Sequence, residues 1–124
     1  MNREILYRGK PVDKQFGKWV FGYYLQDLDN GKIKHYIFNC PLKIEIDPET
    51  VGQFTGIIDT NVDKIFEGDI LNIYNSLIGR VVWCYSKSGF VLKSQNDYIL
   101  NYLGAYDDDI KIIGNIYDTP SLLK

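Results

Sequence analysis

The chain has 124 residues, of which 45% are hydrophobic, 24% charged and 15% aromatic, and its net charge is −2. This composition is that of an ordered globular domain, and an acidic chain with scattered Lys and Arg is not typical of proteins that follow nucleic-acid backbones. Ten Tyr and six Phe against a single Ala favour strands over helices. No apolar run approaches the roughly 20 residues of a membrane helix. The N-terminus has no signal-peptide pattern, so we expect a cytoplasmic protein with no membrane contact.

The first fifty residues contain four segments with strand patterns. Gly22 lies inside the second segment and suggests a bulge or a close backbone approach. Asn30-Gly31 separates the second and third segments and is a strong hairpin signal. Asp47-Pro48 then starts a turn, which we take as a boundary between two parts of the chain. Residues 1–50 form an N-terminal β-rich subdomain, and residues 51–124 form the second part. The four expected strands are 5–7, 19–25, 33–38 and 43–47.

The second part of the chain begins with its densest group of turn signals, between residues 51 and 74. We expect one strand over 65–74, entered through Glu67-Gly68-Asp69, and then four further short elements joined by tight turns. Five short strands with such spacing fit a small SH3-like or OB-like barrel, so the expected fold class is mainly β. The four further elements are 80–85, 90–93, 98–103 as a strand or helical turn, and 111–117, and a terminal helical turn over 118–123 follows them.

The chain has few residues suited to metal binding or nucleophilic catalysis. Cys40 and Cys84 form no C-x-x-C motif, and His35 is the single histidine, so zinc spacing is absent and we expect no metal and no cofactor. We interpret both cysteines as buried thiols and His35 as a surface residue of a hairpin. The acidic run 107–109 lacks the spaced ligands of a calcium loop and is interpreted as a solvated turn.

Glu67 and Asp69 are the best candidates for paired carboxylates. Two residues apart on a strand, they would point to one face and could do acid–base or metal work. The structural interpretation is stronger, because Glu-Gly-Asp at a strand entrance is typical of a turn whose Asp accepts backbone N–H groups. We therefore expect no catalytic residue.

Several phrases occur in an order that resembles the YopX protein family of bacteriophages and prophages. They are REI with YRGK at 3–10, WVFG at 19–22, TVGQFTG at 50–56, Asp59, KIFEGDI at 64–70, and IGNIY at 113–117 with Leu122-Leu123. One departure is the turn Thr60-Asn61-Val62-Asp63, where the family usually has a Lys-Asn-Gly type turn. The motif positions that we interpret as structural are Gly52, Gln53, Thr55, Gly56, Asp59, Glu67, Gly68, Asp69, Gly114 and Asn115.

The resemblance implies a β-rich N-terminal subdomain, an SH3-like barrel and an oligomer, and it implies no reaction or ligand. We therefore expect a phage- or prophage-encoded, non-enzymatic binding or assembly protein in the bacterial cytoplasm. Its expected partners are copies of itself and an unknown phage or host protein. The candidate interface is the apolar run beginning at residue 19, whose residue types are enriched at interfaces. It comprises Trp19, Phe21, Tyr23 and Tyr24.

An alternative function is single-stranded nucleic-acid binding on a platform of stacked aromatic side chains. We do not expect this, because the net charge is acidic and Trp19 and Trp83 lie in strong strand patterns that predict burial. The platform would comprise Trp19, Tyr23, Trp83, Tyr85 and Phe90.

Overall fold

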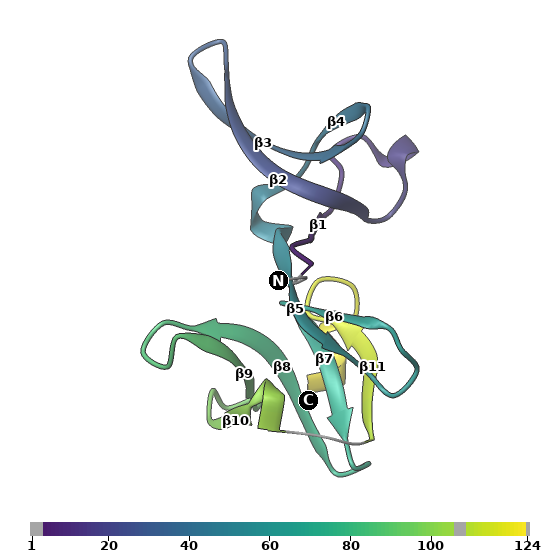
Figure 1. Ribbon diagram of the computed structural model, residues 1–124, viewed down its shortest axis with the longest axis vertical. Coiled ribbons are helices and arrows are strands. Elements are labelled where there is room, and N and C mark those ends of the chain that lie inside the picture. Colours follow the sequence, from purple (N-terminus) through teal and green to yellow (C-terminus); the bar gives the residue numbers. More distant parts are fainter. Residues whose placement is uncertain (1–3, 106–108, 124) are drawn as a thin grey trace. The chain divides into compact units, whose positions relative to one another are not determined.

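The protein is an all-β chain built from two antiparallel sheets, as the computed structural model shows for residues 4–105 and 109–123 (Figure 1). It divides into two compact units, residues 1–54 and residues 55–124. The division lies within one strand and four residues later than the sequence boundary at residue 50. The helical elements of the described residues are short 3-10 turns. No helix in this part of the chain has the length and apolar character needed to cross a membrane.

Unit 1 is an antiparallel sheet in the order β4-β3-β2-β1, with the first residues of β5 next to β1. Asn30 and Gly31 join β2 and β3 with φ values of 52° and 78°, the left-handed conformation that a two-residue hairpin turn needs. One face of the sheet buries Val20, Ile37 and Ile44 together with Ile46. The elements are β1 (Tyr7–Gly9), η1 (Lys14–Phe16), β2 (Val20–Asp29), β3 (Lys32–Asn39), β4 (Leu42–Glu45), η2 (Pro48–Thr50) and β5 (Gly52–Ile58).

Gly22 is required in β2 because its backbone lies against β3. A Cβ atom at this position would collide with the carbonyl oxygen of Phe38. The close backbone approach that the sequence predicted at Gly22 is therefore confirmed.

Unit 2 contains a five-stranded antiparallel sheet in the order β10-β9-β8-β7-β11, which curls into a half-barrel (Figure 1). Its concave face is filled by fully buried aliphatic side chains, among them Leu71, Val81 and Leu92. The elements are β6 (Lys64–Phe66), β7 (Asp69–Ile73), β8 (Leu77–Cys84), β9 (Gly89–Lys93), β10 (Ile99–Tyr102), η3 (Leu103–Ala105), β11 (Ile110–Asn115) and η4 (Pro120–Leu123).

Three predicted elements differ from the structure. The single strand over 65–74 is two strands, because Glu67 and Gly68 form a turn between β6 and β7. The strand expected over 80–85 begins three residues earlier as β8, so Gly79 lies within the strand, where its missing side chain allows contact with Leu92. The sequence also missed β5, since its two glycines resembled turn signals.

The predictions of buried cysteines and of a buried Trp83 were wrong. Cys40 is exposed, Cys84 is half-buried, and both thiols are free. A hydrogen bond with the Ser86 hydroxyl lowers the pKa of Cys84 below its ordinary value. Trp83 is 40% exposed although it lies on the same face of β8 as the buried Val81, because it is next to the last residue of that strand and pairs with the half-buried Phe90. The strand pattern did not show how far along β8 the core would extend.

Candidate functional site

Asp59 organises the turn at the start of unit 2. Its Oδ1 accepts hydrogen bonds from the backbone N–H groups of Asn61 and Asp63, both at 2.9 Å, and its Oδ2 accepts from Ile112 at 3.2 Å. Thr60 accepts from the N–H of Ile110 through its hydroxyl at 2.9 Å. The carboxylate is buried, so it serves as an anchor between this turn and β11 and is not available for chemistry on a substrate.

The Glu67-Gly68-Asp69 motif is a turn and not a pair of carboxylates on one strand face. Gly68 has a φ of 94°, and its N–H donates to the Val81 carbonyl at 2.9 Å. The buried Asp69 accepts a hydrogen bond from the backbone N–H of Phe66 at 2.7 Å. The expectation that Glu67 and Asp69 point to one face was wrong, because the turn at Gly68 separates them. A backbone-capping role for Asp69 is what the geometry shows.

The remaining motif residues also make structural contacts. Thr55 donates its hydroxyl hydrogen bond to the Ile65 carbonyl at 2.8 Å, and Gly56 adopts a φ of 87°. Gly114 faces Thr119 so closely that a Cβ atom would collide with it. Asn115 Oδ1 accepts from the N–H groups of Tyr117 and Asp118 at 3.0 and 2.9 Å. Gly52 and Gln53 lie opposite Arg8 and Tyr7 in the β1–β5 ladder.

Within residues 4–105 and 109–123, no three His, Cys, Asp or Glu side chains come together in a metal-binding arrangement. Of the acidic run, Asp107 and Asp108 lie outside the described residues. His35 lies within a hairpin, where its ring stacks on Tyr24 and its Nδ1 shares a hydrogen bond with the Tyr24 hydroxyl. The contact that positions the His35 ring is therefore with the aromatic residue Tyr24 and not with a catalytic nucleophile.

An exposed aromatic cluster lies on the β8–β9 hairpin of unit 2. The Trp83 ring meets Phe90 edge-on at a centroid distance of 5.1 Å, and Tyr85 at 6.4 Å. Tyr85 is 88% exposed. The structure therefore brings together three of the five aromatic residues that the sequence offered as a stacking platform. The other two, Trp19 and Tyr23, belong to unit 1.

The four candidate interface residues of unit 1 differ in exposure. Tyr23 is 66% and Phe21 42% exposed, whereas Trp19 and Tyr24 are half-buried. The Arg8 guanidinium lies 4.5 Å from the Trp19 ring centroid. Phe21 and Tyr23 thus present side chains to solvent on one face of β2, while Trp19 and Tyr24 contribute to packing within the unit.

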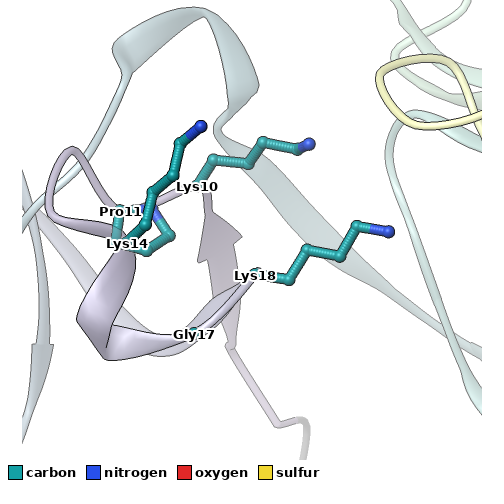
Figure 2. Close-up of a pocket in the computed structure, with 5 residues that line it drawn as sticks. All are labelled: Lys10, Pro11, Lys14, Gly17 and Lys18. Carbon is teal, nitrogen blue, oxygen red and sulfur yellow. The ribbon is translucent and has the colours of Figure 1, made fainter.

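A pocket of about 490 Å³ lies in the segment between β1 and β2. Lys10, Lys14 and Lys18 line it together with Pro11 and Gly17, and Figure 2 shows the three lysine side chains running toward the same side. Sequence analysis missed this cluster and treated the lysines as scattered. The three lysines are spaced four residues apart in the sequence, but this spacing did not indicate a cluster before the η1 turn was known.

The fold is that of a two-unit, all-β protein with a curled second sheet. The YopX protein family model matches residues 7–124, and the chain belongs to that family. Among solved structures, it is similar to protein EF1440 from Enterococcus faecalis, a crystal structure with 19% sequence identity and a TM-score of 0.48. That similarity covers 99% of this chain and 100% of the other. The search of curated proteins finds no match.

Proposed function

We propose that this YopX family member is a phage- or prophage-encoded, non-enzymatic binding or assembly protein of the bacterial cytoplasm that assembles through copies of itself. The observation that carries the proposal is the long β2–β3 hairpin of unit 1 (Figure 1). β1 pairs with β2 only at residues 20–22, and β4 pairs with β3 only at residues 36–39. The distal part, residues 26–34, has no third strand among the described residues of its unit. We call this part the arm.

The arm carries apolar side chains that unit 1 does not use in its core. Leu28 and Ile33 lie directly opposite each other and are 70% and 61% exposed. A two-stranded ribbon is marginal alone in water, and exposed apolar pairs on it are typical of a contact surface. Tyr23, which precedes the arm on β2, is a second exposed side chain on the opposite face of that strand.

A second copy of the chain is a suitable partner for the arm, because positive and negative charges balance in the ion pairs of the arm. Lys43 contacts Asp27 at 2.7 Å, and Lys34 contacts Asp29 at 3.1 Å. The hydrogen bond from Lys43 lowers the pKa of Asp27, and the bond to Asp29 raises the pKa of Lys34, which favours the charged forms of Asp27 and Lys34 at neutral pH. Two identical arms can therefore meet antiparallel, edge to edge, without repulsion between like charges.

The test is the mass in solution at micromolar concentration, measured by multi-angle light scattering. We expect an oligomer for the wild type, and species near 14.4 kDa for Leu28→Lys and Tyr23→Glu. Val62→Lys is the matched control, because Val62 is 72% exposed but lies in a turn of unit 2. A wild-type chain of 14.4 kDa would contradict the proposal, as would an oligomer that Leu28→Lys and Tyr23→Glu both leave intact.

The buried carboxylates support a non-enzymatic role. Asp59 and Asp69 both accept backbone N–H groups and are nearly inaccessible to solvent. Groups engaged in this way stabilise local structure and are poorly placed to transfer a proton to a ligand.

The exposed aromatic cluster favours one alternative, the binding of single-stranded nucleic acid by unit 2. Trp83 and Tyr85 are 40% and 88% exposed, and Lys87 lies 5.7 Å from the Tyr102 ring nearby. The net charge of −2 opposes it, so we expect weak or absent binding in fluorescence polarisation with labelled DNA and RNA oligonucleotides. Submicromolar binding that weakens steeply with salt and is lost in Trp83→Ala would place this alternative first.

A further inference from the structure

The two edges of the curled sheet in unit 2 differ in how their backbone groups are bonded. β11 forms one edge, and the turn that begins at Asp59 covers it. The N–H of Ile112 donates to Asp59 Oδ2 at 3.2 Å. The N–H of Ile110 donates to the Thr60 hydroxyl at 2.9 Å, and its carbonyl accepts from the Thr60 N–H at 2.8 Å. These bonds occupy the groups that another strand would need.

β10 forms the other edge and has β9 as its neighbouring strand among the described residues of unit 2 (Figure 1). Ile99 is 39% and Tyr102 45% exposed. The N–H of Tyr102 donates to Oδ1 of the adjacent Asn101 at 2.8 Å, a bond within the strand and not to another segment. A register shift between Ile99 and Asn101 keeps the edge short. β10 therefore presents a short open edge that can pair with one extended segment.

A groove of about 240 Å³, open to solvent, runs along this edge. All four residues of β10 line it, together with Lys87 from the loop between β8 and β9. Successive side chains of a strand point to opposite faces, so a hollow that touches all four residues follows the open side of the strand. Its volume is below the roughly 300–1,000 Å³ of small-molecule sites, which favours one or two side chains of a peptide.

Lys87 gives the groove a positive charge. Its ammonium group lies 5.7 Å from the Tyr102 ring centroid, and its backbone carbonyl accepts a hydrogen bond from the Tyr102 hydroxyl at 3.3 Å. No carboxylate of the described residues pairs with this ammonium group, and no acidic residue lines the groove. One lysine suits one carboxylate, whereas a nucleic-acid strand needs several cationic contacts to its phosphates.

We propose that the edge of β10 binds an extended peptide of a partner protein, in which an Asp or Glu side chain pairs with Lys87. The peptide adds a strand to the sheet, so hydrogen bonds to the backbone of β10 supply affinity and the groove selects side chains. β-branched residues beside the acidic one favour the extended conformation. This inference goes beyond self-association and does not depend on it, because β10 belongs to unit 2 and the arm to unit 1.

The test is selection from a yeast-displayed library of random octapeptides, with the full chain as the target. We expect the enriched peptides to combine β-branched residues with Asp or Glu. For the most enriched peptide, Lys87→Gln should weaken binding about fivefold in fluorescence polarisation, because it removes one charge-assisted contact. Lys111→Gln is the matched control, because it removes the same charge from β11, the covered edge, and it should keep the wild-type affinity.

Methylation of the peptide backbone tests strand addition itself. In an added strand, alternate N–H groups of the peptide donate to β10 and the others point away from it. Methylating the nitrogen atoms of one alternate set should therefore abolish binding, and methylating the other set should largely preserve it.

Four results would overturn the proposal. The first is a library without enriched peptides, and Lys87-dependent binding of a short single-stranded DNA oligonucleotide would then assign the groove to nucleic acid. The second is equal weakening by Lys87→Gln and Lys111→Gln, which would show diffuse attraction. The third is an equal effect of the two methylated sets, which would exclude strand addition. The fourth is a wild-type oligomer that Lys87→Gln dissociates, which would assign the edge to a second copy. Circular dichroism establishes that both variants are folded before the comparison.

Discussion

At the scale of single residues, the polar positions of the family motif serve the backbone. Asp59 and Asp69 cap N–H groups of turns, and Asn115 accepts two N–H groups at the end of β11. The local sequence was sufficient to predict the role of Asp69, because Asp beside a turn glycine bonds within a few residues. It could not identify Ile112 as a partner of Asp59, since that contact spans 53 positions.

Gly68 carries the most specific prediction at this scale. Its φ of 94° lies where residues with a side chain are strained, so Gly68→Ala should lower the free energy of unfolding by about 1–2 kcal/mol. Urea denaturation measures this change. Gly104→Ala is the control, because a Cβ there meets its nearest neighbour, Ile57, at an ordinary 3.9 Å, and we expect nearly unchanged stability. Equal stability of the two variants would contradict the role assigned to Gly68.

At the scale of elements, the β2–β3 hairpin has a proximal and a distal part that differ in their surroundings. Its proximal part belongs to the sheet, with Ile37 fully buried between neighbouring strands. Its distal part, the arm, is held by its turn, by cross-strand pairs and by side-chain ion pairs to β4 such as Lys43–Asp27. The hairpin signal at Asn30-Gly31 predicted the turn correctly, but it carried no information on how far β1 and β4 would reach.

Gly31→Ala tests this division. A Cβ atom at Gly31 would meet nothing within 4 Å, so its cost comes only from the φ of 78° and should be about 1 kcal/mol. We expect amide hydrogen exchange in the arm to accelerate about fivefold, because the arm can open without the sheet. Exchange in β7 should stay unchanged as the internal reference. Acceleration throughout unit 1 would show instead that the arm and the sheet open together.

At the scale of the whole molecule, stability rests on two hydrophobic clusters that share no residue. One gathers around Ile37 and Ile46 in unit 1, and the other around Leu71, Val81 and Leu92 in unit 2. Each unit covers one face of its own sheet, so each has a core despite the small size of the chain.

The contrast between two leucines tests where the core lies. Leu71 is fully buried, and Leu71→Ala should lower the free energy of unfolding by about 2–5 kcal/mol through lost burial and a residual cavity. Leu28 is 70% exposed, and Leu28→Ala should change it by less than about 0.5 kcal/mol in the dissociated chain. Thermal unfolding at low concentration compares the two. Similar losses would mean that Leu28 contributes to the core.

The sequence by itself determined the β class, the family, the hairpin at Asn30-Gly31 and the turn glycine at Gly68. These features depend on contacts within a few residues or on conformations that one residue type adopts. Tertiary structure alone decided that Trp83 faces solvent, that β5 is a strand and that Asp59 reaches β11. It also decided that three separate lysines share one pocket. Strand alternation gives two faces but does not say how far along a strand the core extends. Side chains from separate positions of a loop come together only when the path of its backbone is fixed.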